Sequence, residues 1–447
     1  MRAVVLGGGI AGLTVGSALA RGGLDTTVVE AAPFPGGLAS GFRDRGYTFD
    51  FFSHRLWTRD PEVLRLVEKW VEGRLLARRK VSRIFLDGKL YNYPLDMRDL
   101  LTGGSAGLAL RSLLGYAAAR IAPERSREDF RGFMISRYGA PLYDTFFGPY
   151  TEKLCGCPSS EISMDLALGA VPQTGILTQL VHRLTGRVEP WDDFLYPARG
   201  FLDLPEGMAR DLTRAGGKLL LGHAVRGVRW LNRRVVAVEA TSGTRSVDLP
   251  ADLVVSTIPL AVLLKTLHPA VDREASEAAA ALHHRAMVAV YLGIRRERIS
   301  EDHWIYVSDP AIRFNRLSET TNYSEAMAPA GCTGICAEIA CDVGDTVWRQ
   351  DDGSQARRVA DDLVKMGLLR STAEVEASWV RRFPGAYPVY RIGYREHLAV
   401  VESHLARIGD LHLCGRQGAF WYGSTAQGIR QGLDLVGRLG LAAAVAA

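Results

Sequence analysis

The sequence lacks any long hydrophobic run. No uninterrupted apolar stretch in its 447 residues reaches the length of about 18 that indicates a membrane-spanning helix. The stretch richest in apolar residues, 107–121, is interrupted by Arg111 and Arg120. The apolar run that follows Arg2 does not predict a signal peptide, because three consecutive glycines interrupt it. We therefore expect a soluble, cytoplasmic protein without an integral membrane segment.

Cysteine is also scarce. Cys155 and Cys157, two of the six cysteines, are too close together for a usual zinc pair, and no second ligand pair lies nearby. Cys332, Cys336 and Cys341 fall in an apolar stretch that is typical of buried core thiols. The sequence therefore predicts no metal site and reduced cysteines.

Clusters of one charge sign and recognisable catalytic sets are missing as well. The formal net charge of +5 comes largely from dispersed arginines, and no basic run contains interleaved aromatics. This pattern argues against nucleic-acid binding. No nucleophile–histidine–acid set can be recognised, so the chemistry is expected to come from a bound cofactor. A chain of 447 residues is longer than a single hydrophobic core usually accommodates. We therefore expect two interleaved domains.

What the sequence does contain is a nucleotide-binding motif at its start. Residues 3–6 predict a buried strand, residues 13–21 a helix and residues 26–29 a second strand, which ends on Glu30. The turn before the helix holds glycines in G-x-G-x-x-G register, formed by Gly7, Gly9, Ile10, Ala11 and Gly12. Such glycines let the backbone approach a pyrophosphate at the helix N-terminus, and the acid accepts the hydroxyls of a ribose. The motif predicts a dinucleotide site.

A second glycine pair indicates which dinucleotide is bound. Gly36, Gly37 and Leu38 come soon after Glu30, and residues 47–50 predict a new strand. This segment resembles the amine oxidase, protoporphyrinogen oxidase and UDP-galactopyranose mutase superfamily of FAD enzymes. The resemblance implies that the second glycine pair passes close to the pyrophosphate and the flavin. It also implies non-covalent FAD as the cofactor, since no histidine or cysteine stands out as a flavin attachment site.

The fold that the resemblance implies is α/β. We expect an FAD-binding Rossmann-like domain of the glutathione-reductase type with a discontinuous α+β substrate domain. The FAD-binding domain would comprise residues 1–80, 194–259 and 395–447. The substrate domain would comprise residues 81–193 and 260–394.

Local patterns predict the elements of the substrate domain. Residues 81–93 predict a hairpin with a type I′ turn at Asp87–Gly88, and the pattern is helical from residue 97 to about residue 183. Four further strands are expected to complete an antiparallel sheet with the hairpin, at residues 288–294, 303–307, 312–316 and 333–339.

Further cofactor residues follow from the resemblance. The backbone of Val225 would bind the adenine. The closing segment resembles the family's "G-R-x-G-x-F-x-Y-x-x-x-x-Q-x-I" end, in which a helix that begins near Ser424 would offer free N–H groups to the flavin pyrimidine edge. The cofactor residues expected there are Gly415, Arg416, Gln427, Gly428 and Ile429.

Candidate catalytic residues come from two places. His54 ends a segment, 49–54, that resembles the family's flavin-lining "F-D-x-G-x-H" loop, although Phe52 replaces its glycine, and Arg55 follows it. Arg316 and Tyr390 belong to an aromatic and cationic set suited to phosphate, carboxylate or ring recognition. The set comprises Trp304, Tyr306, Arg313, Arg316, Tyr323 and residues 387–390. The alternative is a sheet whose aromatics simply pack against helices.

Two reactions agree with these residues. We favour an FAD-dependent oxidoreductase of the amine oxidase and protoporphyrinogen oxidase-like family, acting on a small molecule such as a sugar or a biosynthetic intermediate. The alternative is a redox-neutral nucleotide-sugar mutase that uses reduced FAD. Residues 150–153 and the closing Gly-Arg pair are mutase-like, whereas residues 196–200 resemble the oxidase form. A flavin-binding scaffold without activity is a third reading.

Overall fold

The computed structural model describes residues 1–93, 106–121, 128–170 and 193–441. The sheet that begins the chain has five strands in the order β20-β13-β1-β2-β9, and all neighbouring strands in it are parallel. Its strands are β1 (Arg2–Leu6), β2 (Asp25–Val29), β9 (Lys218–Leu220), β13 (Leu253–Ser256) and β20 (Leu411–Leu413). Segments more than 400 residues apart therefore share one sheet.

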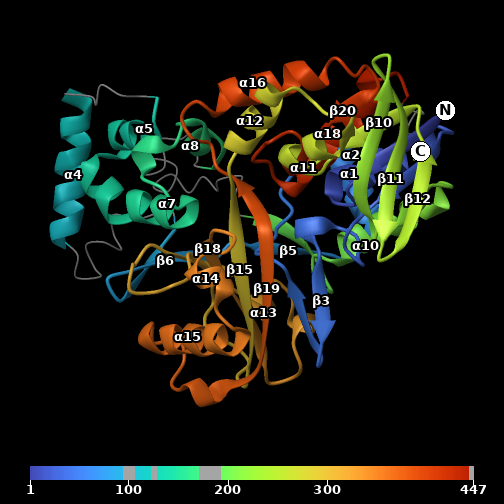
Figure 1. Ribbon diagram of the computed structural model, residues 1–447. Coiled ribbons are helices and arrows are strands. Elements are labelled where there is room, and N and C mark those ends of the chain that lie inside the picture. Colours follow the sequence, from blue (N-terminus) through green and yellow to red (C-terminus); the bar gives the residue numbers. More distant parts are fainter. Residues whose placement is uncertain (94–105, 122–127, 171–192, 442–447) are drawn as a thin grey trace.

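Helices pack around this sheet (Figure 1). They are α1 (Ile10–Arg21), α2 (Pro61–Trp70), α10 (Asp203–Arg214) and α18 (Thr425–Arg438). Asp60 caps α2 by accepting hydrogen bonds from Glu62 N and Val63 N, and Pro61 occupies the first turn. Their apolar faces and the sheet form one buried core, which includes Leu13, Leu19, Val67, Met208 and Val436.

A second sheet lies beside the first, in the order β12-β11-β10-β14. Its strands are β10 (Ala224–Leu231), β11 (Arg234–Ser242), β12 (Arg245–Pro250) and β14 (Leu267–His268). The helices α11 (Leu260–Thr266), α12 (Arg273–Ala281) and α16 (Tyr394–Leu405) pack next to it, and α12 contacts α16 (Figure 1).

The largest sheet has seven strands in the order β19-β15-β18-β17-β16-β6-β7. Its strands are β6 (Ser82–Leu86), β7 (Lys89–Asn92), β15 (His284–Ile294), β16 (Trp304–Val307), β17 (Arg316–Glu319), β18 (Thr333–Cys341) and β19 (Val375–Pro388). Three helices accompany it: α13 (Thr320–Tyr323), α14 (Thr346–Arg349) and α15 (Asp352–Lys365). Asp87 and Gly88 both have positive φ, which confirms the predicted type I′ turn.

Two sequence predictions about this sheet are wrong. The strand expected at residues 312–316 begins only at Arg316, because the preceding backbone bonds to side chains: Ile312 O accepts from Lys153 Nζ, and Arg313 N donates to Asp362. The sheet is also not wholly antiparallel, since β16 runs parallel to β6. This parallel pair joins the hairpin to the later strands.

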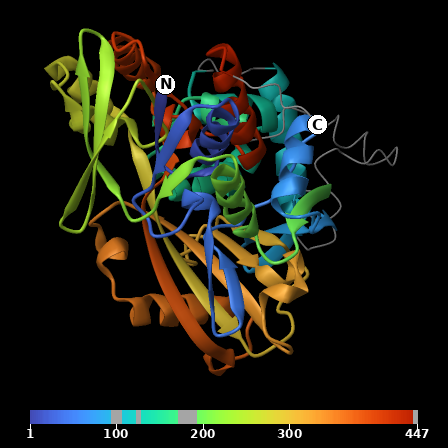
Figure 2. The ribbon, with the colours of Figure 1, turned by 90° about the vertical axis from the view of Figure 1, so that its right-hand side faces the viewer.

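Two short ribbons complete the strands. The β3 (Gly41–Asp44) and β4 (Tyr47–Asp50) hairpin lies against the large sheet (Figure 2). Phe49 of this hairpin packs on Tyr291 of β15. The strand β5 (Leu75–Arg79) pairs with β8 (Asp193–Pro197).

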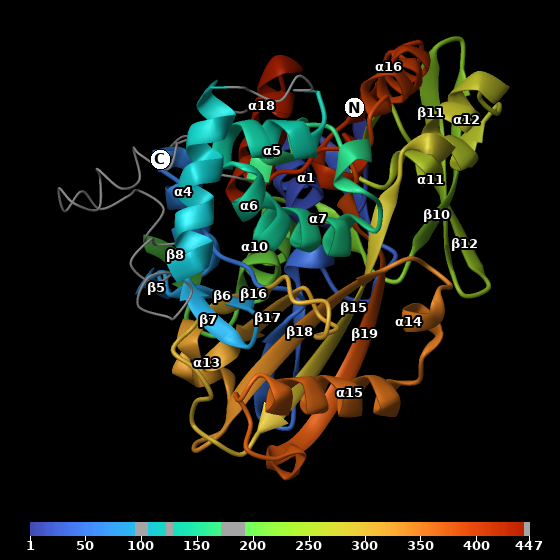
Figure 3. The same ribbon diagram turned by 90° about the vertical axis from the view of Figure 1, so that its left-hand side faces the viewer.

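A layer of helices covers one side of the molecule (Figure 3). It contains α4 (Ala106–Ile121), α5 (Phe130–Tyr138), α6 (Ala140–Leu142), a π-helical turn at Tyr143–Phe147, α7 (Gly148–Cys155) and α8 (Asp165–Ala170). The predicted helical region reaches into residues 94–105, 122–127 and 171–192, which lie outside the described residues. Within the described residues, no helix is long and apolar enough to cross a membrane.

All six cysteines are free. Five of them are buried, but Cys332 is only half-buried, which corrects the expectation of a core thiol at that position. Its Sγ lies 3.8 Å from the carboxylate of Glu376.

Candidate functional site

The first glycine turn connects β1 to α1 through close backbone contacts. Gly7 has a φ of +98°, in the region that favours glycine, and its N–H donates to Val29 O over 2.8 Å. A Cβ on Gly12 would overlap the carbonyl oxygen of Gly7. The first and third glycines of the motif are therefore required by the fold itself.

The second glycine of the motif stands in open space. A Cβ on Gly9 would meet no other atom closer than Gly36 O, at 4.0 Å. Gly9 also precedes α1, and no side chain caps that helix end. The combination of free space and a helix N-terminus without a side-chain cap is suited to a phosphate group.

The structure brings the second glycine pair directly to the first turn. Gly36 N donates to Gly8 O over 2.8 Å, Gly9 and Gly36 form a parallel bridge, and Gly36 has a φ of +107°. A Cβ on Gly37 would lie 3.5 Å from the Cα of Gly9. Two glycine turns that are 27 residues apart thus form one backbone cradle, which we call the glycine cradle, comprising residues 7–12 and 36–37.

Glu30 is anchored at the edge of the glycine cradle. One carboxylate oxygen accepts from Gly8 N and the other from Ala32 N, each over 2.7 Å. Each oxygen keeps a further lone pair that can accept a hydroxyl. Val225 lies close by in the chain, since the N–H of His223 donates to Glu30 O over 2.9 Å.

The C-terminal motif reaches the same place. Gly415 has a φ of +79°, its N–H donates to Gln431 Oε1 over 2.8 Å, and a Cβ there would crowd the Cβ of Ala11. Gly428 on α18 faces Ile10, whose Cγ2 would lie 4.0 Å from an added Cβ. The start of α18 therefore lies beside the start of α1.

The N–H groups at the start of α18 are less free than the sequence predicted. Ser424 and Gln427 form a reciprocal capping box, in which Gln427 N donates to Ser424 Oγ and Ser424 N donates to Gln427 Oε1. Gly428 N donates to Ser424 O, and the side chain of Ile429 is fully buried in the core. These contacts use the N–H groups of Gln427 and Gly428 within the helix, and the expected roles of Gln427, Gly428 and Ile429 at the flavin stay predictions.

His54 connects the candidate catalytic loop to the glycine cradle. Its Nε2 lies 2.7 Å from Leu38 O, a carbonyl that can only accept, so Nε2 carries the proton. The imidazole stacks on Phe201 with ring centroids 4.9 Å apart. Burial, together with the charges of Arg416 and Arg316, lowers the pKa of His54 to about 4. His54 is therefore neutral at pH 7.

Arg316 forms a bidentate ion pair with a buried acid. Its Nε and Nη2 donate to the two carboxylate oxygens of Glu338 over 2.8 and 2.6 Å, and Nη2 also donates to Tyr387 over 3.0 Å. Glu338 is 1% exposed and also accepts from Ser53 N. The guanidinium fork expected to bind a substrate anion is thus occupied by the protein's own carboxylate.

Arg416 lies against two tyrosines near this pair. Its guanidinium is 5.4 Å from the ring centroid of Tyr387 and 5.3 Å from that of Tyr422, and its Nη2 donates to Gly423 O. Tyr390 is held by structural contacts: its hydroxyl accepts from Tyr422 N, and its ring stacks on Tyr394.

The structure separates the other members of the predicted aromatic and cationic set. Arg313 donates to Gln350 beside α15 and does not join Arg316. Trp304 is buried in the core, and Arg55 stacks over its ring at 4.5 Å. The alternative of aromatics that pack within the sheet therefore holds for part of the set.

Several residues of this region were not among the candidates from the sequence, although Asp50 lies in the segment 49–54 that resembles the flavin-lining loop. Asp50 is buried, and it accepts hydrogen bonds from the Tyr196 hydroxyl and from Phe201 N, the residue on which His54 stacks. Burial raises the pKa of Asp50 to about 7. The sequence did not predict Gly8, Gln431 and Glu338. Each makes its contact through the backbone or with a residue distant in the sequence, and residue type alone does not reveal such contacts.

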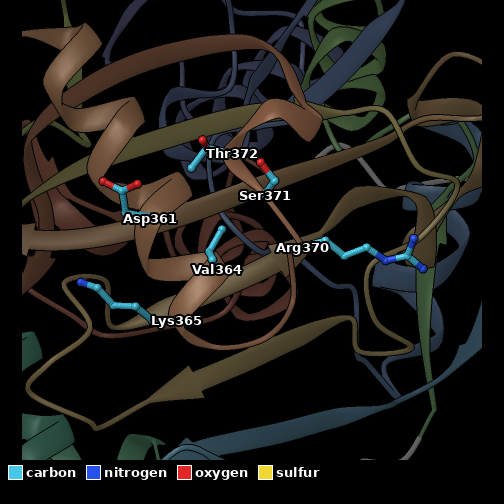
Figure 4. Close-up of a pocket in the computed structure, with 6 residues that line it drawn as sticks. All are labelled: Asp361, Val364, Lys365, Arg370, Ser371 and Thr372. Carbon is cyan, nitrogen blue, oxygen red and sulfur yellow. The ribbon is translucent and has the colours of Figure 1, made fainter.

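A cavity of about 540 Å³ lies elsewhere, beside α15 (Figure 4). Its lining residues are Asp361, Val364, Lys365, Arg370, Ser371 and Thr372. Since α15 and α1 lie at different ends of the molecule (Figures 1 and 3), this cavity does not belong to the glycine cradle.

Comparisons with known proteins agree with this geometry. A sequence model of the flavin containing amine oxidoreductases matches residues 10–438. Phytoene dehydrogenase of Streptomyces griseus is 26% identical over 308 residues, which are 63% of this chain and 59% of that protein. This match spans less than two thirds of the relative's length.

Solved structures share the fold over nearly the whole chain. A reduced UDP-galactopyranose mutase aligns with a TM-score of 0.80 and 19% identity, over 99% of this chain and 94% of that protein. A protein of Exiguobacterium sp. 255-15, provisionally assigned as a protoporphyrinogen oxidase, aligns with a TM-score of 0.76 and 18% identity, over 98% of each chain. The α/β fold and the resemblance expected from the sequence are thereby confirmed.

Proposed function

The chain belongs to the flavin containing amine oxidoreductase family, and from that premise we propose that it is an FAD-dependent oxidoreductase acting on a small molecule. The observation that carries the proposal is the glycine cradle, in which two glycine turns are hydrogen-bonded around the open space at Gly9. A flavin bound there would supply reversible hydride uptake.

The residues present fit a flavin dinucleotide. The N-terminus of α1 and the open backbone at Gly9 would receive the pyrophosphate, and the remaining lone pairs of Glu30 would accept the ribose hydroxyls. A site for a pyrophosphate and a second site for a ribose are needed together only if the flavin carries an adenosine diphosphate part. Their presence therefore favours FAD as the cofactor. Backbone atoms at Val225 would complete the adenine site.

Non-covalent binding agrees with the state of the thiols. Burial raises the pKa of Cys155 and Cys341 to about 12 and that of Cys414 to about 11. These thiols stay protonated at neutral pH and are poor nucleophiles.

The residues around His54 would shape the reacting side of the site. His54 fixes Leu38 and, through Phe201, connects to Asp50. Arg416 with Tyr387 and Tyr422 forms an aromatic and cationic wall that would orient a substrate ring. These groups would bind and position the substrate. His54 in its neutral form can accept a hydrogen bond at Nδ1.

The mutase alternative keeps its mutase-like segments, residues 150–153 and the closing Gly-Arg pair, but it loses one candidate substrate contact. Arg316 was the candidate for binding a diphosphate, and the Glu338 carboxylate already occupies the fork of that guanidinium. The partial similarity to a dehydrogenase supports the oxidoreductase instead. We therefore favour oxidation of a C–N or C–C single bond to a double bond, in which a hydride leaves a C–H bond of the substrate for the flavin and the neighbouring atom loses a proton.

The test is anaerobic reaction of the purified flavoprotein with amines, amino sugars and partly saturated rings. An oxidoreductase substrate should bleach the oxidised flavin band, and air should restore it. The matched arm offers nucleotide sugars to dithionite-reduced enzyme. Product formed only by reduced enzyme, without consumption of an acceptor, would overturn the proposal in favour of the mutase.

A further inference from the structure

The helix α4 lies at the outer edge of the helical layer and has two different faces (Figures 1 and 3). The inner face packs on the protein: Ser112 and Ala119 are buried, and a Cβ on Gly115 would overlap the ring of Pro141. The helix contacts α5 and α6 along this side. Its fixed orientation therefore decides which residues point outward.

The outer face carries large apolar side chains. Leu110 is 59% exposed, Leu113 53%, Leu114 62% and Ile121 86%. Their spacing of three, four and eleven residues places them on one stripe of an α-helix, together with the alanines at positions 117 and 118. An apolar stripe that faces outward is uncommon on a protein that functions as an isolated molecule in water.

The charges of α4 are all positive. The helix contains no Asp or Glu, and its two charged residues are Arg111 and Arg120. At about 100° per residue, these two positions lie on opposite flanks of the stripe, each about a quarter of a turn around the helix from its apolar centre. A stripe of leucines flanked by arginines is the arrangement of a helix that lies in a lipid–water interface.

The size of the stripe favours a lipid surface over a second copy of the chain. A helix of 16 residues is about 24 Å long and about 10 Å wide, and so offers roughly 240 Å². A stable protein interface needs about 800 Å² from each partner. A bilayer has no such requirement, because a single amphipathic helix can insert its apolar face.

We propose that the outer face of α4 binds the surface of an anionic lipid bilayer, with Leu110, Leu113, Leu114 and Ile121 in the acyl boundary and Arg111 at the headgroups. This surface is separate from the glycine cradle, so the protein would carry out its reaction while docked on a membrane.

The test is flotation of the full-length, flavin-loaded protein with phosphatidylcholine vesicles, with and without phosphatidylglycerol. We expect binding to the anionic vesicles, weakened by salt and by Arg111→Gln. The double variant Leu110→Glu/Leu114→Glu should lower the partition coefficient at least about tenfold. Leu231→Glu is the matched control, because Leu231 is 64% exposed on β10, at the far end of the molecule from α4, and this variant should bind as the unmodified protein does.

Turnover without vesicles should be unchanged in all four proteins, which separates docking from catalysis. The proposal is overturned if the unmodified protein does not float with anionic vesicles, or if the double variant floats equally well. A concentration-dependent dimer that Leu114→Glu dissociates, without vesicle binding, would instead assign the face to a second copy.

Discussion

Arg316 and Glu338 stand directly opposite each other on β17 and β18, and their side chains are joined by two parallel hydrogen bonds. The pair also holds Tyr387 and the backbone of Ser53, so four separate segments meet at one buried ion pair. Removing one partner leaves a buried charge uncompensated. We therefore predict that Arg316→Met lowers the free energy of unfolding by about 3–5 kcal/mol.

Urea unfolding of Arg316→Met, Glu338→Leu and the double variant checks this prediction. The double variant should regain most of the lost stability, since an apolar pair leaves no unpaired charge. If Arg316→Met instead keeps full stability and only raises KM for a diphosphate substrate, the arginine belongs to the substrate site, as the sequence had suggested.

Gly9 and Gly12 should respond differently to a side chain. Gly9→Val should fold with unchanged stability, because the space beside residue 9 is open, but its side chain should exclude the flavin. Gly12→Ala should destabilise the apoprotein, because the new Cβ overlaps the carbonyl oxygen of Gly7. The measurements are the visible flavin absorbance per protein and the thermal midpoint of the apoprotein. Full flavin content in Gly9→Val would refute the nucleotide site.

Glu30→Ala should weaken FAD binding by about 1.5–3 kcal/mol, the usual value for a hydrogen bond to a charged group. Turnover at saturating FAD should stay nearly unchanged, since the ribose is remote from the reacting ring. Titration of the apoprotein with FAD measures the effect, and Glu277→Ala, which removes an exposed acid on α12, is the control. A collapse of turnover with FAD still bound would assign Glu30 another role.

Asp50 should make the stability of the protein fall as the pH rises from about 4 to about 7. In this window the unfolded chain has lost the Asp50 proton, whereas the folded protein retains it because burial raises its pKa to about 7. Proton release therefore favours unfolding. The nearly isosteric Asp50→Asn removes this dependence, and an Asn oxygen can still accept from Phe201 N.

The measurement is the difference between the unfolding free energies of the two proteins across the pH range. The difference is required because Glu319, His284 and His303 also have shifted pKa values and titrate in the same region. Parallel curves for the two proteins would show that Asp50 is ionised in the fold at every pH in the window.

The nucleotide layer could be predicted from the sequence because its signals are local. The spacing of Gly7, Gly9 and Gly12 between two apolar runs fixes a strand, a turn and a helix with few alternatives. The hydrogen bond from Gly36 N to Gly8 O was not predicted in detail, but the second glycine pair indicated that the two turns approach the same group.

The contacts of Arg316, Glu338 and Asp50 could not be predicted in the same way. The partner of Arg316 depends on the register of β17 against β18, and the sequence pattern misplaced the start of β17 by four residues. Glu338 and Asp50 are acids inside apolar runs, where residue type alone does not distinguish a buried ion pair from a buried neutral acid. Such pairings follow from tertiary packing and leave no periodic signal.

The order of strands in the parallel sheet has a consequence for synthesis on the ribosome. β1 is made first but lies between β2 and β13, and β13 in turn pairs with β20, which begins at Leu411, more than 400 residues after β1. β1 must therefore wait for β13 to gain its second neighbour, and β13 in turn lacks its outer neighbour until almost the whole chain has emerged. Completion of this sheet is a late, post-translational event with high contact order, and the nascent chain is exposed to aggregation or to chaperones until then.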